Sequence, residues 1–232
     1  TVDLNINVFE MEIPVQREIE RIGNYYTVSF SPKIHSFKQI FFKRVMDIVG
    51  AIVGLLITGI VTVFLAPALL IESPGPLFFS QVRVGKNGRR FKIYKFRSMY
   101  MDAEERKKEL MSQNEMEGLM FKMENDPRVT KVGKFIRKTS IDELPQFWNI
   151  LKGEMSLVGT RPPTEDEFLQ YEGYHRRRLN MTPGLTGLWQ DTKNFEEIVA
   201  MDVEYIDNWS LKEDIKILFK TVGVVLKGKG AS

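Results

Sequence analysis

The chain contains no cysteine and only two histidines, His35 and His175, among its 232 residues. Without cysteine there is no disulfide and no thiolate metal site, which fits a reducing compartment. The two histidines lie far apart in the sequence, and this spacing argues against a histidine-based zinc site. The first 35 residues mix acidic and apolar side chains without a basic start or a cleavage site, so no signal peptide is expected among them.

A large excess of one charge is also missing, because the formal net charge is only +3. The charge is nevertheless patterned, with basic residues concentrated at 83–97, 128–138 and 176–178. Such patches beside a membrane segment indicate anionic lipid headgroups or phosphorylated substrates. The run 176–178 is interpreted as a surface or lipid-facing patch. No known nucleic-acid module is evident, so no nucleic acid is expected as a partner.

One uncharged apolar run, residues 48–71, is about 24 residues long and is therefore long enough to cross a bilayer core as a helix. Basic residues flank it on both sides, and positive flanks tend to stay cytoplasmic. A helix that enters, bends and returns satisfies both flanks, whereas a single passage does not. Pro67 supplies the bend, because proline lacks an N–H and clashes with the preceding turn. The hydroxyls of Thr58 and Thr62 are expected to help satisfy the interrupted hydrogen bonds.

We therefore predict three parts: a leader at 1–38, interpreted as the remnant of an upstream domain; a re-entrant membrane helix at 39–72; and a cytoplasmic domain with membrane-surface helices at 73–232. The alternatives for the apolar run are an ordinary single-pass helix and a buried core helix.

The remaining pattern predicts an α+β fold rather than a doubly wound sheet. Asn87-Gly88 between two apolar stretches predicts a β-hairpin within residues 77–100. A strand is expected at 25–30 and a short extended piece at 155–158. Helices are expected at 15–22, 102–111, 129–138, 143–151, 164–171, 195–209 and 211–226.

Asp142 and Glu143 are the sharpest candidates for chemistry. Neighbouring helical positions point about 100° apart, so the two carboxylates can hold different roles. A helix N-terminus would keep Asp142 ionised as a nucleophile or metal ligand. The alternative is that Ser140 and Glu143 form a capping box that merely closes the helix end. Pro145 complicates this account, because it falls inside the helix that Ser140 would cap.

Arginines at positions 128, 137 and 161 could bind phosphate through two parallel hydrogen bonds, and the alternative is a solvated basic face. Arg161 lies in a rigid turn before two prolines, which would fix its position. Asp202 is a lone acid on an apolar helix face, so it is either a paired structural acid or a substrate contact.

Several segments together resemble the bacterial sugar transferase family, the monotopic polyprenyl-phosphate phosphoglycosyl transferases. The similarity runs from about residue 41 to residue 231, and its segments occur in the family's order. They are residues 42–47, 73–79, 95–99, 126–130, 139–146, 151–159, 161–162 and 183–187.

The resemblance implies transfer of a sugar-1-phosphate from a UDP-sugar to polyprenyl (undecaprenyl) phosphate, with release of UMP. It implies that the family's Asp-Glu pair falls on Asp142 and Glu143, with Asp142 forming a covalent phosphosugar ester. A Mg²⁺ ion, with Asp142 as its protein ligand, would neutralise the diphosphate. Pro67 would break the re-entrant helix, and residues 73–232 would form the cytoplasmic catalytic domain. The phosphate-binding set is expected to be Lys95, Arg97, Arg128, Arg137 and Arg161.

Further substrate contacts are expected at Gln190, Lys193 and Asp202. Many family members carry an arginine after the glutamine, whereas here Gln190 is followed by Asp191 to Asn194, and Lys193 is the basic residue that remains. The expected partners are a UDP-sugar, polyprenyl phosphate and membrane lipids, with a homodimer as a further candidate. The expected location is the cytoplasmic face of the bacterial inner membrane. A non-enzymatic, membrane-anchored interaction protein is the competing hypothesis.

Overall fold

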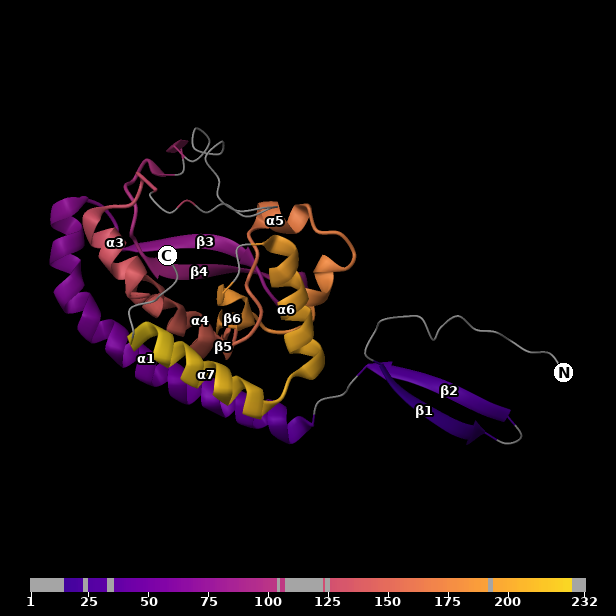
Figure 1. Cartoon of the computed structure of the whole chain (residues 1–232). Coiled ribbons are helices and arrows are strands. Elements are labelled where there is room, and N and C mark those ends of the chain that lie inside the picture. The colour runs from indigo at the N-terminus through magenta and orange to yellow at the C-terminus, as the bar shows by residue number, and fades with distance from the viewer. Residues whose placement is uncertain are drawn as a thin grey trace. The chain divides into compact units, whose positions relative to one another are not determined.

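The computed structural model describes residues 15–22, 25–32, 36–103, 105–106, 123, 126–191 and 194–226. The chain divides into two units, residues 1–40 and 41–232. In the first unit, β1 (Val15–Ile22) and β2 (Tyr25–Pro32) form an antiparallel hairpin that pairs Val15 with Pro32 and Ile22 with Tyr25 (Figure 1). The predicted strand at 25–30 is confirmed, and the helix predicted at 15–22 is wrong. Its apolar residues have helical spacing, but pairing across the hairpin overrides that local signal.

The apolar run forms one helix, α1 (Phe37–Glu72), which changes direction along its length while remaining helical (Figure 1). Within the described residues it is the one helix long and apolar enough to cross a membrane, with a mean hydropathy of 2.7 and only 17% of its most apolar window buried. That exposure contradicts the buried core helix. Pro67 lies inside α1. The hydroxyls of Thr58 and Thr62 bond the carbonyls of Gly54 and Thr58 at 2.7 and 2.6 Å, so they do not serve the carbonyl that Pro67 leaves free.

Polar side chains near the start of α1 fasten this helix to the rest of the second unit. Lys43 Nζ contacts Asp214 Oδ2 at 2.6 Å and the carbonyl of Val158 at 2.9 Å. Arg44 donates two hydrogen bonds of 2.8 Å to backbone carbonyls at the end of α4 (Phe147–Lys152). We expected these two cations to be a positive flank of the membrane segment. They are instead internal, because buried cations need acceptors and the folded domain supplies them.

Two small sheets organise the second unit. The strands β3 (Phe78–Val84) and β4 (Arg90–Phe96) pair antiparallel around η2 (Lys86–Gly88), which confirms the predicted hairpin. Asn87 and Gly88 both adopt positive φ, at 57° and 76°, as a tight hairpin connection requires. The second sheet pairs β5 (Ser156–Val158) with β6 (Gly184–Thr186) in parallel.

Helices surround these sheets, so the α+β class is confirmed (Figure 1). The helix predicted at 143–151 is divided into η4 (Ile141–Gln146) and α4, because Pro145 interrupts regular α-helical bonding. The helix predicted at 102–111 falls mostly outside the described residues. The other helical segments are α3 (Lys131–Lys138), α5 (Glu165–Leu169), η5 (His175–Asn180), η6 (Leu188–Asp191), α6 (Phe195–Asn208) and α7 (Leu211–Leu226).

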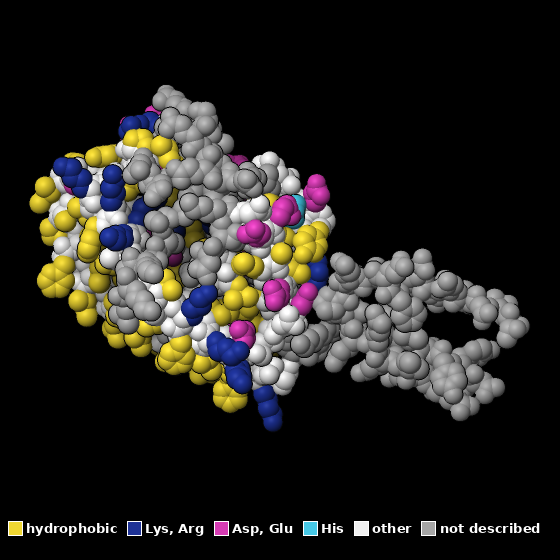
Figure 2. Space-filling model, in the orientation of Figure 1, with side chains coloured by type: hydrophobic (Ala, Val, Ile, Leu, Met, Phe, Trp, Pro, Cys, Tyr) yellow, Lys and Arg dark blue, Asp and Glu magenta, His cyan; other side chains and the backbone are white. Residues whose placement is uncertain are grey.

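Apolar side chains are exposed along one edge of the molecule, where α1 and α7 lie (Figures 1 and 2). On α7, Phe219 is 76% exposed and Ile215 and Val222 are also exposed. The opposite face of α7 contributes Ile217 to the main core, together with Ile150, Met155 and Trp209. An apolar edge of this kind, continuous over two helices, is typical of a surface that contacts lipid.

Candidate active site

The acidic pair lies on η4, directly after an unusual backbone turn. Ser140 adopts a left-handed conformation with φ 55° and ψ 17°, and its side chain makes no capping hydrogen bond. The capping-box interpretation of Ser140 and Glu143 is therefore wrong. A real capping box does occur in this chain, between Thr164 and Glu167 at the start of α5, as the sequence predicted. The carboxylates of the acidic pair are thus available for other interactions.

Glu143 pairs with strand β4, since Lys95 Nζ lies 2.5 Å from Glu143 Oε1. Arg137, on α3, donates from Nε to Ser98 Oγ at 3.0 Å, and no carboxylate among the described residues forms an ion pair with it. The charges of Lys95, Glu143 and Arg137 all act on Asp142. The structure thus brings together four of the predicted residues, which we call the dyad cluster: Asp142, Glu143, Lys95 and Arg137.

Asp142 is only 7% exposed, and no side chain among the described residues donates a hydrogen bond to it. Burial raises its pKa to about 6, while Lys95 and Arg137 oppose this shift and Glu143 adds to it. We expected a helix N-terminus to favour the ionised form. The short 3₁₀ segment does not outweigh burial, because the macrodipole effect is small. At neutral pH the carboxylate is still mostly ionised, and it is poorly solvated, as suits a nucleophile.

Two of the predicted phosphate ligands are already engaged by the protein. Arg97 is 7% exposed and donates to the backbone carbonyls of Ser73 and Pro74, so it holds the loop between α1 and β3. Arg128 forms a two-pronged ion pair with Asp126, with its shortest contact at 2.6 Å. Their hydrogen bonds therefore give both guanidinium groups a structural role.

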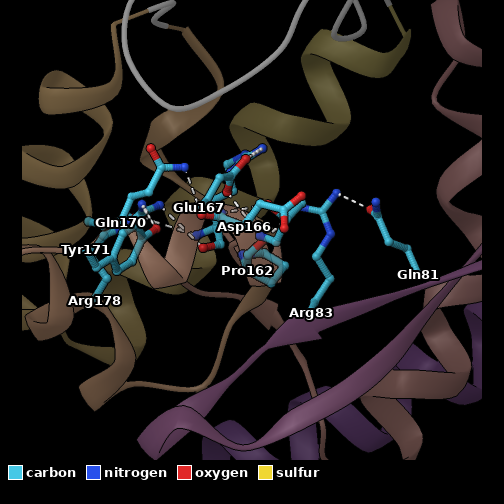
Figure 3. Close-up of polar contacts among 11 residues, drawn as sticks. Gln81, Arg83, Pro162, Asp166, Glu167, Gln170, Tyr171 and Arg178 are labelled. Carbon is cyan, nitrogen blue, oxygen red and sulfur yellow. Dashed lines mark hydrogen bonds and ion pairs between the residues drawn. The ribbon is translucent and has the colours of Figure 1, made fainter. Parts of the chain in front are cut away.

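Arg161 and Asp202 belong to a second polar group, part of which Figure 3 shows. Arg161 forms two hydrogen bonds with Glu167, at 2.9 and 3.3 Å. Burial disfavours its charge, but Glu167 outweighs that effect and holds the pKa of Arg161 above its usual value. Asp202 is 1% exposed and accepts from Arg178 Nε at 2.7 Å. Of the two alternatives for Asp202, the structure shows the paired structural acid.

Arg178 itself corrects an expectation about the basic run at 176–178. Its side chain is fully buried, and besides Asp202 it donates to Tyr171 Oη at 2.7 Å. Arg177 pairs with Asp207 at 2.9 Å, which leaves Arg176 as the exposed member of the run. The run is therefore not a uniform surface patch, because η5 directs its successive side chains to different surroundings.

The other expected contacts are only partly located. Gln190 lies on η6, and its side chain is outside the description. Lys193 lies outside the described residues altogether. Arg83 was not singled out from the sequence, because there it is one member of the basic stretch 83–97. Its alternation with Gln81 along β3 was the available signal, since residues two apart on a strand share a face.

The carboxylates of the site were also considered as ligands for a metal. No group of three or more His, Asp or Glu side chains suited to a metal occurs within the described part of the chain. Magnesium commonly uses one or two carboxylates and takes its other ligands from water and substrate phosphates. Asp142 fits that pattern as a single ligand, because its carboxylate oxygens have no side-chain donor among the described residues while Glu143 is paired with Lys95.

A long apolar helix, an exposed apolar edge and a buried carboxylate between cations together define a membrane-associated protein with a candidate site for a phosphorylated ligand. The model of the bacterial sugar transferase family matches residues 38–228. The chain belongs to this family.

Curated relatives agree with that assignment. The chain is 52% identical over 235 residues to the galactosyl transferase CpsE of Streptococcus agalactiae, covering 99% of this chain and 52% of the relative. It is 44% identical to the undecaprenyl-phosphate galactose phosphotransferase of Salmonella typhimurium, covering 82% of this chain and 42% of the relative. The exopolysaccharide production protein ExoY of Rhizobium meliloti is 40% identical, with 82% of this chain and 87% of the relative covered. The chain thus spans about half the length of the first two relatives.

Proposed function

We propose that this protein transfers a sugar-1-phosphate from a UDP-sugar to polyprenyl phosphate, as the first step in building a surface polysaccharide. The observation that carries the proposal is the buried Asp142 carboxylate, which lies beside the Lys95–Glu143 pair and within the electrostatic reach of Arg137. Family membership supports the same reaction, because relatives are named as sugar phosphotransferases that use undecaprenyl phosphate.

The reaction has two steps that share one phosphorus atom. Asp142 attacks the phosphorus that carries the sugar, and the bond from this phosphorus to the bridging oxygen breaks, so UMP leaves with the electron pair. An oxygen of polyprenyl phosphate then attacks the same phosphorus and displaces Asp142. The products are polyprenyl-diphosphate-sugar and a regenerated carboxylate. Burial supports this role for Asp142, because a weakly solvated carboxylate is a better nucleophile.

The remaining members of the dyad cluster hold charge in place during these steps. Arg137 is the described cation best suited to a phosphate oxygen, because its side-chain hydrogen bond within the described part of the chain is to a hydroxyl and the charge of Asp142 acts on it. Lys95 keeps Glu143 fixed beside the nucleophile. We also propose that Mg²⁺ binds with Asp142 as its protein ligand, where it would neutralise the charge of the diphosphate.

The membrane provides the acceptor substrate. We propose that α1 enters and leaves on the cytoplasmic face of the inner membrane, so that the site meets both a soluble nucleotide donor and a lipid-held acceptor. The exposed apolar residues of α1 and α7 support contact with lipid. A homodimer is also proposed, and size measurement of the purified protein in detergent would test it.

The direct test is release of UMP by purified protein that is given polyprenyl phosphate, Mg²⁺ and a panel of UDP-sugars. The printed names of relatives include galactose, N-acetylgalactosamine and glucose, so the panel contains all three. We expect UMP from at least one donor and none from the Asp142→Asn variant. The matched control is Glu204→Gln, which removes an exposed carboxylate on α6 and should keep full turnover.

The two outcomes that would contradict the proposal are distinct. Full turnover by Asp142→Asn would exclude the covalent aspartyl step while leaving an enzyme. The absence of UMP release with every donor would favour the non-enzymatic membrane-anchored protein.

A further inference from the structure

Arg83 is a half-buried cation that lacks a carboxylate partner within the described part of the chain. Its Nη1 donates to the carbonyl of Pro162 at 3.0 Å, and its Nη2 donates to Gln81 Oε1 at 2.8 Å (Figure 3). Its Nε is buried and has no hydrogen-bond partner among the described residues. Buried N–H groups are almost always satisfied, so an unsatisfied one on a cation indicates a missing acceptor.

The backbone around Arg83 fixes this side chain firmly. Val84 N donates to the carbonyl of Pro163 at 3.0 Å, and Arg83 forms a β-bridge with Thr164. The edge of β3 is thereby attached to the rigid segment that follows Arg161. Because both terminal nitrogens are also held, the guanidinium is preorganised rather than free to swing toward solvent.

The local charge balance leaves room for an anion. Among the described residues, the guanidinium groups of Arg161 and Arg178 are paired with Glu167 and Asp202, whereas that of Arg83, on which the charge of Arg161 also acts, forms no ion pair. Burial and the like charge of Arg161 lower the pKa of Arg83 to about 10, so it is still a cation at neutral pH. An arriving anion would relieve both the repulsion and the lost solvation.

The position of Arg83 connects this group to the dyad cluster. The charge of Glu143 acts on Arg83 directly, as do those of Arg161 and Glu167. In the register of the hairpin, Phe79 is paired with Lys95, so Lys95, the partner of Glu143, lies on the face of the hairpin that also carries Gln81 and Arg83. Since Gln81 accepts through its oxygen, its amide nitrogen is directed to act as a second donor beside Arg83.

We propose that Arg83, oriented by Gln81, binds the diphosphate of the nucleotide donor on the side of the leaving UMP. This inference rests on the proposed function and adds a substrate-binding residue to it. The pair offers N–H donors and a positive charge, which suits phosphate oxygens. Uracil is the poorer match, because its ring N–H requires an acceptor.

The test compares the dissociation constant for UDP and the KM values for both substrates in three variants. Arg83→Gln removes the cation. Gln81→Glu keeps the cation but places a carboxylate against it. Glutamate and glutamine have nearly the same shape, so this variant cancels the positive charge of the anion site without removing a side chain. We expect each to weaken UDP binding at least tenfold and to raise the KM for the UDP-sugar, with the KM for polyprenyl phosphate unchanged. Arg89→Gln, an exposed arginine on the same hairpin, is the control that should bind as wild type does.

The possible outcomes distinguish a failure of this inference from a failure of the proposed function. If wild type releases UMP and both variants bind UDP normally, the inference fails and the function stands. A change confined to the KM for polyprenyl phosphate would reassign Arg83 to the acceptor and overturn the proposal. Wild-type protein that neither binds UDP nor releases UMP overturns both. If Arg83→Gln does not fold, the Gln81→Glu variant provides the test, because it adds an ion pair to the folded protein and removes no charged group.

Discussion

Lys95 Nζ lies 2.5 Å from Glu143 Oε1, so one carboxylate of the acidic pair is neutralised by strand β4. Asp142, the next residue back in the chain, has no such contact among the described side chains and is almost fully buried. Two adjacent acids thus meet different environments. This difference is a common way for a protein to give neighbouring carboxylates separate roles.

The rate of UMP release should fall as the pH is lowered through about 6, because burial raises the pKa of Asp142 to about 6 and attack requires the ionised form. Lys95→Met removes a charge that lowers this pKa, so the acid limb of the pH–rate profile should move to higher pH. Glu143→Gln removes a charge that raises it, so the limb should move to lower pH. Profiles of kcat/KM against pH measure both, and shifts in the same direction would contradict the assignment.

Asp142→Asn should stabilise the fold while it abolishes turnover. The pKa of Asp142 is raised from its usual value near 4 to about 6 on folding, so the native state loses stability as the pH rises from about 4 to about 6, and this loss stays constant at higher pH. Removing that charge should raise the free energy of unfolding by roughly 2 kcal/mol at pH 8. The gain should disappear below pH 4, where the group is protonated in both states. Denaturant unfolding in detergent at the two pH values is the measurement, and a less stable variant at pH 8 would refute this account.

Ser140 should tolerate the loss of its hydroxyl, because it makes no capping hydrogen bond. Ser140→Ala should change the free energy of unfolding by less than about 0.5 kcal/mol. Ser140→Gly should raise the free energy of unfolding by about 1 kcal/mol, since glycine adopts the left-handed conformation without strain. Thr164→Ala is the positive control, because it removes a real cap and should lose about 1 kcal/mol. A similar loss in Ser140→Ala would restore the capping interpretation.

Asp202→Asn should damage the fold rather than substrate binding. Arg178 is fully buried, and loss of its charged partner should lower the free energy of unfolding by about 3 kcal/mol. The remaining folded protein should keep its KM for the UDP-sugar. Asp207→Asn is the matched control, because its pair with Arg177 is partly exposed and should contribute less than about 1 kcal/mol. A raised KM with unchanged stability would make Asp202 a substrate contact instead.

Two glycines of α1 provide a test of how this helix packs. A Cβ on Gly54 would lie 2.3 Å from the ring of Phe147, whereas a Cβ on Gly59 would have no atom within 4 Å. Gly54→Ala should therefore force the helix and α4 apart and lower the melting temperature by several degrees. Gly59→Ala should not lower it, because alanine is the better helix former. Equal melting temperatures for the two variants would show that α1 does not pack on Phe147.

Features of the fold that depend on neighbouring residues could be predicted from the sequence, whereas features that depend on distant residues could not. The hairpin at Asn87-Gly88, the cap at Thr164 and the apolar helix were predictable, because each depends on a few neighbouring residues. The segment 15–22 was misread, because its spacing suits a helix while its hairpin partner makes it a strand. Pro145 gave a partial warning that the helix after Ser140 would be irregular.

The candidate site divides in the same way. Residue order alone identified the acidic pair and, through the resemblance, its proposed role. Sequence could not tell which arginines are available, since Arg97, Arg128 and Arg161 look equivalent to Arg137 until their acceptors are known.

The amino-acid sequence by itself determined the long apolar helix, the mixture of short strands and helices, and the family. Only the tertiary structure decided that Lys43 is internal, that Ser140 does not cap and that the charge of Glu143 acts on Arg83, which has no carboxylate partner of its own among the described residues. The physical reason is that the behaviour of a charge depends on its solvation and its acceptors, and folding brings these from parts of the chain that are far apart in sequence.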